Sequence, residues 1–202
     1  KDGRPSSKIY TQTYFIGPDI MNIYDTPVIS LVTEEKNLFS NDNGIYVPGV
    51  NFNENAEEPI LTGNFFQKGI PWERNMHIEY FNKSGLRDFF QDSGVRIHGG
   101  RSRSFAQKSL RLYARDEYGK SNFNYSLLPN TENKKYNRFL LRATMGSWNE
   151  SIIADVLAQN IINNLNIDHQ DYQPVIVFLN GEYWGIHTIR DYINEDYLNY
   201  NH

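Results

Sequence analysis

Residues 174–189 read PVIVFLNGEYWGIHTI, and this stretch gives the clearest fold signal in the chain. Two runs of β-branched and aromatic residues flank Asn180-Gly181, a dipeptide that favours a two-residue type I′ turn. The stretch therefore predicts a β-hairpin. Further strands are predicted from similar runs at residues 9–16, 27–33, 76–81, 95–98, 108–113 and 138–142.

The sequence predicts one long helix, which precedes the hairpin. Ser147 and Glu150 have the spacing of a capping box, and apolar residues recur at helical intervals from Ile153 to about Leu165. A short helix is expected over residues 194–200. Because the strands come in antiparallel runs that do not alternate with helices, the predicted fold class is α+β, an antiparallel sheet with one main packed helix.

Composition argues against several classes of protein. The 202 residues are 39% hydrophobic, which is enough for a core, and no apolar run approaches the roughly 18 residues that a membrane span needs. The net charge of −4 and the pI of about 5.7 argue against general nucleic-acid binding. Without cysteine the chain can form neither a disulfide nor a thiolate zinc site, and the five histidines lack metal-ligand spacing. We therefore expect no nucleic-acid partner, no membrane span and no metal site.

Charge is unevenly distributed along this acidic chain. Residues 93–115 contain six basic residues and no acidic one, so the rest of the chain carries 14 basic and 24 acidic residues. The centre of this basic segment combines a flexible backbone with hydroxyl and guanidinium donors. It consists of Gly99, Gly100, Arg101, Ser102, Arg103 and Ser104. Such a segment attracts phosphate or carboxylate groups, although a solvated basic hairpin would have the same composition.

Lys108 begins a strand whose alternate residues are apolar. In an extended strand it shares a face with Leu110 and Leu112, so its side chain points toward the core or a cleft. Two interpretations remain open: the amine reaches water at the edge of the sheet, or it brings a positive charge to a bound phosphate. Glu150 and Asp155 of the predicted helix are carboxylates that could pair with this lysine or lie in solvent.

Two motifs, in the right order, resemble those of the spore-coat CotH kinase family. The first is GVRIHGGRSRSFAQKSLRL at residues 94–112, and the second is FLNGEYWGI at residues 178–186. Residues 141–155 take the place of the family's intervening helix, and the resemblance covers about residues 27–198. It implies a fold like the N-lobe of an atypical protein kinase, and transfer of phosphate from ATP to Ser residues of coat or surface proteins.

The resemblance also implies roles for particular residues. Residues 99–104 would form the turn that covers the phosphates, Lys108 would contact them, and Glu150 or Asp155 would lie on the helix that orients this lysine. The backbone near residues 189–192 could meet adenine. ATP and Mg²⁺ are the implied cofactors, and the ligands of the metal are expected beyond residue 202.

Two positions depart from the family's pattern. Ala154 stands where an arginine is expected before the helix aspartate, and Asp191 stands where a glutamate is expected after the hairpin. Asp191 is still counted among the expected nucleotide-binding residues. The family's catalytic and metal-binding aspartates lie downstream of the hinge, and no residue of this sequence matches them. We therefore expect this fragment not to turn over ATP by itself.

The expected organisation has two parts. Residues 1–25 would be a linker or the tail end of a preceding β module, and residues 26–202 the N-terminal portion of a CotH kinase-like domain. The expected partners are a nucleotide and a protein substrate with Ser acceptors, in a spore coat, at a cell surface or in a secreted protein. The alternatives are a noncatalytic module for coat assembly or invasin-like adhesion, and carbohydrate binding on the β-rich face.

Overall fold

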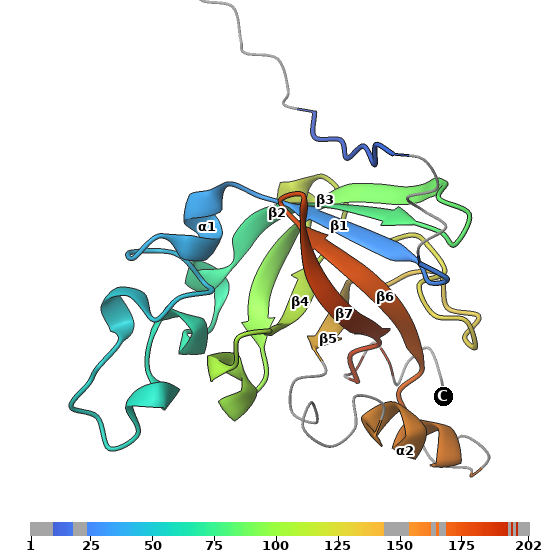
Figure 1. Cartoon of the computed structure of the whole chain (residues 1–202). Coiled ribbons are helices and arrows are strands. Elements are labelled where there is room, and N and C mark those ends of the chain that lie inside the picture. The colour runs from blue at the N-terminus through green and yellow to red at the C-terminus, as the bar shows by residue number, and fades with distance from the viewer. Residues whose placement is uncertain are drawn as a thin grey trace, which may run out of the picture.

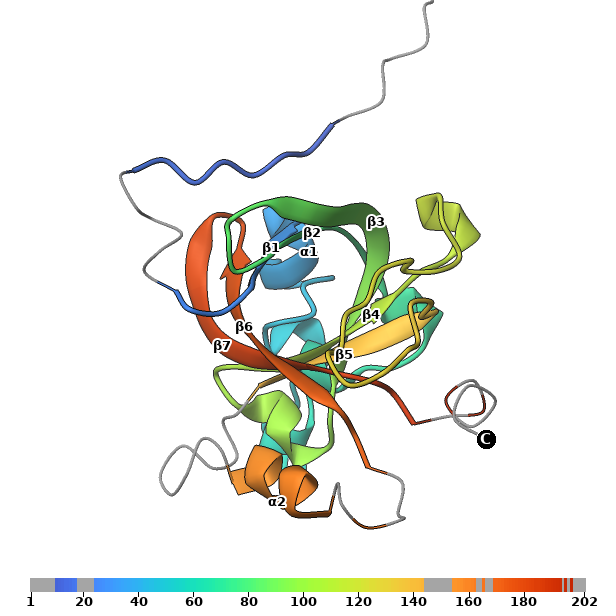
Figure 2. The same cartoon turned by 90° about the vertical axis from the view of Figure 1, so that its right-hand side faces the viewer.

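Seven strands form a closed barrel in the part of the chain that the computed structural model describes (Figures 1 and 2). The structure describes residues 10–17, 24–143, 154–162, 165, 169–193, 195 and 197. The strands are β1 (Val28–Val32), β2 (Arg74–Phe81), β3 (Arg87–His98), β4 (Ser109–Tyr113), β5 (Arg138–Ala143), β6 (Tyr172–Leu179) and β7 (Glu182–Arg190). Their order around the barrel is β1-β2-β3-β4-β5-β7-β6.

Within the described residues, one parallel pairing closes the barrel. Strand β1 pairs antiparallel with β2 and parallel with β6, where Val28 lies opposite Ile176. The other pairings are antiparallel. The predicted α+β fold, with an antiparallel sheet like a kinase N-lobe, is therefore wrong. Periodicity identifies strands from local sequence, but it does not show that β1 and β6, which are far apart in the chain, lie side by side.

Alternation along the strands gives the barrel an apolar inside. Ile97 of β3 lies opposite Leu110 of β4, and both are buried in the core. The next pair, Arg96 and Arg111, faces outward because successive side chains of a strand point to opposite faces. The same two strands thus fill the core on one side and carry basic groups on the other.

The predicted hairpin is confirmed. Strands β6 and β7 pair from Tyr172 and Arg190 to Leu179 and Glu182. Asn180 and Gly181, which join them, have φ angles of 51° and 86°, and positive φ at both positions is what a type I′ turn requires. The sequence between the strands therefore determined both the position and the type of this turn.

The helices are short and lie outside the barrel (Figure 1). They are the α-helices α1 (Glu35–Phe39) and α2 (Ala154–Ile162) and the 3₁₀ turns η2 (Gly49–Asn51), η3 (Pro59–Leu61), η4 (Asn64–Phe66), η5 (Ile70–Trp72), η6 (Arg101–Ser104) and η7 (Asp116–Tyr118). No residue of α2 is buried, so the expectation of one main packed helix fails as well. Glu150 and most of residues 194–200 lie outside the described residues. In the described part, no helix has the length and apolar character that crossing a membrane requires.

Candidate functional site

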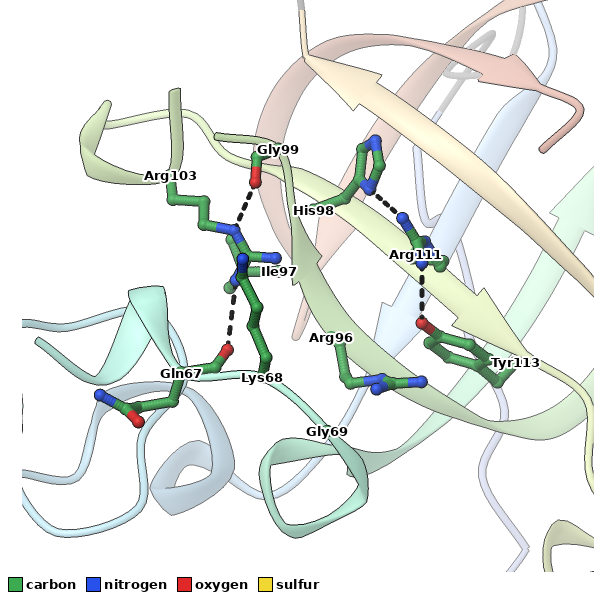
Figure 3. Close-up of a pocket in the computed structure, with 10 residues that line it drawn as sticks. All are labelled: Gln67, Lys68, Gly69, Arg96, Ile97, His98, Gly99, Arg103, Arg111 and Tyr113. Atoms are coloured by element: carbon green, nitrogen blue, oxygen red, sulfur yellow. Dashed lines mark hydrogen bonds between the residues drawn. The ribbon is translucent and has the colours of Figure 1, made fainter. Parts of the chain in front are cut away.

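The outer face of β3 and β4 carries a pocket of about 290 Å³ (Figure 3). Strands β3 and β4 and the turn η6 supply its arginines, and the segment before β2, which carries Lys68, lies across from them (Figure 3). The lining residues are Gln67, Lys68, Gly69, Arg96, Ile97, His98, Gly99, Arg103, Arg111 and Tyr113. We call this site the arginine pocket. Two of the predicted site residues, Gly99 and Arg103, belong to it.

Arg103 is held in the pocket by backbone carbonyl groups. Its Nε donates to the Gly99 oxygen at 2.6 Å, and Nη1 donates to the oxygens of Phe65 at 3.1 Å and Gln67 at 3.2 Å. Burial, and then the charge of Arg111, lowers the pKa of Arg103. Among the described residues no carboxylate forms an ion pair with it. An anion in the pocket would therefore relieve an uncompensated charge.

Gly99 is the position in this turn that requires glycine. Its φ of 120° is a conformation that other residues rarely adopt. A Cβ atom there would also come within 2.5 Å of the Ser102 hydroxyl oxygen. Gly100, by contrast, is exposed and has open space around the position of a Cβ. The close approach of Gly99 lets its carbonyl oxygen fix Arg103.

The remaining residues of the predicted turn make other contacts. Arg101 is largely exposed and forms an ion pair with Glu58 at 2.9 Å. The Ser104 hydroxyl donates to the Arg101 carbonyl oxygen at 2.8 Å. These contacts stabilise the turn itself, so only part of the predicted phosphate-covering segment lines the pocket.

Arg111 lies between the polar side chains of His98 and Tyr113 (Figure 3). Its Nη2 donates to His98 Nδ1 at 2.5 Å, and its Nη1 donates to the Tyr113 hydroxyl at 3.3 Å. The guanidinium carbon lies 4.0 Å from the centre of the Tyr192 ring. Burial, reinforced by Arg111, lowers the pKa of His98 to about 4, so its ring is neutral at pH 7 and can accept this hydrogen bond.

Arg111 also keeps unused donor capacity. Its Nε is buried and has no hydrogen-bond partner among the described residues. No carboxylate of the described part forms an ion pair with it. A guanidinium has five N–H donors in a fixed planar fork, a geometry that suits phosphate oxygens. Arg111 therefore has a free N–H donor and an unneutralised charge with which it could bind an anion.

Arg96 is different because a carboxylate holds it. Its Nε lies 3.1 Å from Glu73 Oε2, and the same carboxylate accepts two hydrogen bonds from Arg115, at 2.7 and 3.1 Å. The Tyr118 hydroxyl donates to Glu73 as well. Glu73 thus offsets the repulsion between the facing arginines of β3 and β4 and anchors that edge of the pocket.

Lys108 lies on the other face of the sheet, as the alternation predicted. It is only 3% exposed and shares the inner face with Leu110 and Leu112. Its Nζ donates to the Phe105 carbonyl oxygen at 2.6 Å and lies 4.5 Å from the centre of the Phe65 ring. Burial lowers its pKa to about 8. The amine therefore neither reaches open water nor points into the arginine pocket.

Asp155, one of the two carboxylates considered as partners of Lys108, binds arginines instead. Asp155 of α2 accepts a hydrogen bond from the buried Arg190 and lies 3.4 Å from Arg142. This contact joins α2 to the outer face of β5 and β7. Asp191 follows β7, and its carboxylate accepts a hydrogen bond from the Tyr192 amide at 2.7 Å. Asp191 therefore lies beside Tyr192, whose ring covers Arg111.

The described residues do not fit a magnesium site. They contain no group of three acidic, histidine or cysteine side chains that could hold a metal ion. Glu73, the carboxylate that pairs with the pocket residue Arg96, is engaged by Arg115 as well. Mg²⁺ is bound by oxygen ligands, which the arginine and lysine side chains of the pocket do not provide, so these side chains suit the phosphate groups and not the ion.

Sequence reasoning missed part of the pocket. The sequence places Arg96 and Arg111 in the basic segment, but no motif assigns them to a site. Gln67 and Lys68 come from a segment before β2 and carry no motif, so nothing in the sequence indicated their position. Only the strand register would have shown that two arginines face each other.

The barrel and its arginine pocket define a β-barrel protein with a cluster of basic side chains on its outer face. The family model described as CotH kinase protein matches residues 95–202, which is more than half of the chain. The chain therefore belongs to the CotH family, and the resemblance inferred from its motifs is confirmed. A search of the curated proteins found no match.

Proposed function

We propose that the chain is the nucleotide-binding part of a CotH-type protein kinase, and that the arginine pocket holds phosphate groups of ATP. The parent protein would transfer phosphate to Ser residues of spore-coat or surface proteins, at a coat, at a cell surface or outside the cell. The observation that supports this proposal most is the pair Arg103 and Arg111. Both lie within the matched residues and line one pocket without a carboxylate partner in the described part.

The chemistry of the pocket suits a polyphosphate. Arg111 offers a fixed guanidinium fork, and Lys68 adds a compact point charge from the opposite side. Arg103 donates hydrogen bonds to three backbone carbonyl oxygens, so we expect it to attract phosphate mainly through its charge. A pocket of about 290 Å³ has room for phosphate groups but not for a whole nucleotide, so the nucleoside would extend beyond it.

Calorimetric titration with a ligand series tests this proposal. ATP, ADP and inorganic tripolyphosphate should all bind, and affinity should fall as phosphates are removed. Adenosine should bind at least 100-fold more weakly than ATP, and the affinity for ATP should fall as salt is added, because the contacts are ionic. Failure of ATP and tripolyphosphate to bind, or equal affinity for adenosine and ATP, would contradict the proposal.

A noncatalytic role in coat assembly or adhesion is the second candidate. It is favoured by exposed apolar side chains in the segment between β1 and β2, namely Val50, Phe52, Ile60 and Ile70. Exposed apolar groups of this kind occur where proteins bind one another. Binding to a partner surface should then survive loss of Arg111 but fall when Phe52 and Ile70 are changed to Ser.

A further inference from the structure

The outer face of β1, β2 and β3 carries a second set of contacts, away from the arginine pocket. The strand register places Ser30, Glu79 and Phe90 in one row across the three strands. In the neighbouring row, Val32 lies opposite His77, and His77 lies opposite Asp92. Side chains of both rows point out of the barrel, because Ile78 between them faces the core.

Residues 10–17 lie along this face in an extended conformation (Figure 2). Thr11, Thr13 and Phe15 are partly buried, whereas the residues between them are exposed. A two-residue alternation is what an extended peptide shows when one of its sides rests on a surface. The segment therefore docks on the barrel through every second side chain.

The central anchor is a buried carboxylate. The Thr13 amide donates to Glu79 Oε2 at 2.6 Å, and the hydroxyl groups of Thr13 and Ser30 form a hydrogen bond of 2.8 Å. Glu79 is fully buried, and its second oxygen accepts from Arg87 at 2.6 Å. A buried carboxylate needs such donors, so the face is built to receive a backbone N–H at this point.

The second anchor is an aromatic slot. The Phe15 ring meets the rings of Phe81 and Phe178 edge-on, each at 5.2 Å between ring centres. Tyr24 also packs against Phe178, at 6.3 Å. Edge-to-face pairs of this kind add to the energy of burying the ring. The slot therefore selects an aromatic side chain two residues after the threonine.

The groove is wider than its occupant at Thr11. Two cavities, of about 210 and 360 Å³, are each lined by Thr11, His77 and Asp92. His77 Nδ1 lies 2.7 Å from Asp92, while its Nε2 is buried and has no hydrogen-bond partner among the described residues. A larger polar side chain at position 11 would have room in this space.

We propose that this outer face is a peptide-binding groove, and that residues 10–17 are its tethered ligand. The groove takes an extended peptide with a threonine at its centre and an aromatic residue two positions later. The covalent tether keeps the segment in place, so a free peptide of the same sequence competes only when the tethered copy is weakened.

A labelled peptide with the sequence of residues 9–17, added to the full chain, tests this inference by fluorescence anisotropy. Phe15→Ala empties the aromatic slot, so the peptide should bind this variant at least tenfold more tightly than the wild type. Tyr14→Ala is the matched control, because Tyr14 is an adjacent but exposed aromatic residue. It should behave like the wild type.

Two further arms make the result decisive. Thr13→Pro removes the N–H that Glu79 accepts, and it should also open the groove to the peptide. A peptide with Gln at position 11 should bind Phe15→Ala more tightly than the natural peptide, and a peptide lacking the aromatic side chain should not bind. Absence of peptide binding to both variants, with circular dichroism showing them folded, would overturn the proposal. Equal binding to Phe15→Ala and Tyr14→Ala would overturn it too.

Discussion

Two groups of arginines on the outside of the barrel differ in their counter-ions. Arg115 and Arg190 bind the carboxylates Glu73 and Asp155, so their charges are used within the fold. Arg103 and Arg111 line a pocket without such a partner in the described residues. Residue type is the same in both groups. The two groups therefore differ in whether a carboxylate of the protein neutralises the arginine, and only an arginine without such a partner has its charge available for a ligand.

Removing the carboxylate of the structural group should have the largest effect. Glu73→Gln leaves Arg96 and Arg115 without their shared counter-ion. Because the Glu73 side chain is almost fully buried, the free energy of unfolding should fall by about 3 kcal/mol. For a chain of this length the melting temperature should fall by roughly 6–12 °C, measured by circular dichroism.

Glu57→Gln is the control for this change, because Glu57 lies in the same segment between β1 and β2 but is exposed. It should alter the melting temperature by less than about 2 °C. An equal loss in both variants would mean that Glu73 is not a structural counter-ion.

Arg111→Gln should have the next largest effect, on binding rather than on stability. Loss of charge-assisted hydrogen bonds to phosphate should weaken ATP binding by about 10- to 100-fold. Arg101→Gln removes a charge from the same segment, but Arg101 is exposed and paired with Glu58, so its affinity should stay within about twofold of the wild type. Calorimetry on both variants checks the comparison, and a larger loss with Arg101→Gln would reverse it.

Lys108 lies on the inner face of the sheet, opposite the arginines of the outer face, and its burial should show in the pH dependence of the free energy of unfolding. Its pKa is about 8 in the fold and about 10.4 in an unfolded chain, so between these values the unfolded state binds more protons. This group therefore makes the protein more stable as pH rises from 8 to 10.4. Lys108→Met should remove that gain, about 2 kcal/mol, in urea unfolding at pH 7.5 and pH 10. The same pH dependence in both proteins would show that the lysine is not desolvated.

The smallest effect is expected at His98, which positions Arg111 through a hydrogen bond. His98→Phe removes the acceptor and should weaken ATP binding about threefold, whereas His98→Gln retains an acceptor and should restore most of the affinity. Because the pKa of His98 is about 4, its ring stays neutral from pH 5.5 to 8. The difference between the wild type and His98→Phe should therefore be constant over that range.

Local features of the structure followed from the sequence. Turn chemistry and strand alternation act over a few residues, so they could be predicted from the sequence. This applies to the Asn180-Gly181 hairpin and to the inward direction of Lys108, and the family could be predicted from its motifs. Closure of the barrel could not be predicted from the sequence, because it depends on the pairing of β1 with β6, which are far apart in the chain. For the same reason, the partner of Asp155 and the position of Lys68 depend on contacts that no local pattern encodes.

The central claim is that phosphate binds the outer arginines and not the lysine on the inner face. Nuclear magnetic resonance of the arginine Nε–Hε groups and of the lysine Cε atoms, during titration with tripolyphosphate, tests it most directly. The signal of Arg111 should shift with saturation, followed by those of Arg103 and Arg96, while that of Lys108 should stay unchanged. A shift of Lys108 with unchanged arginines would contradict the account and place the phosphate on the inner face.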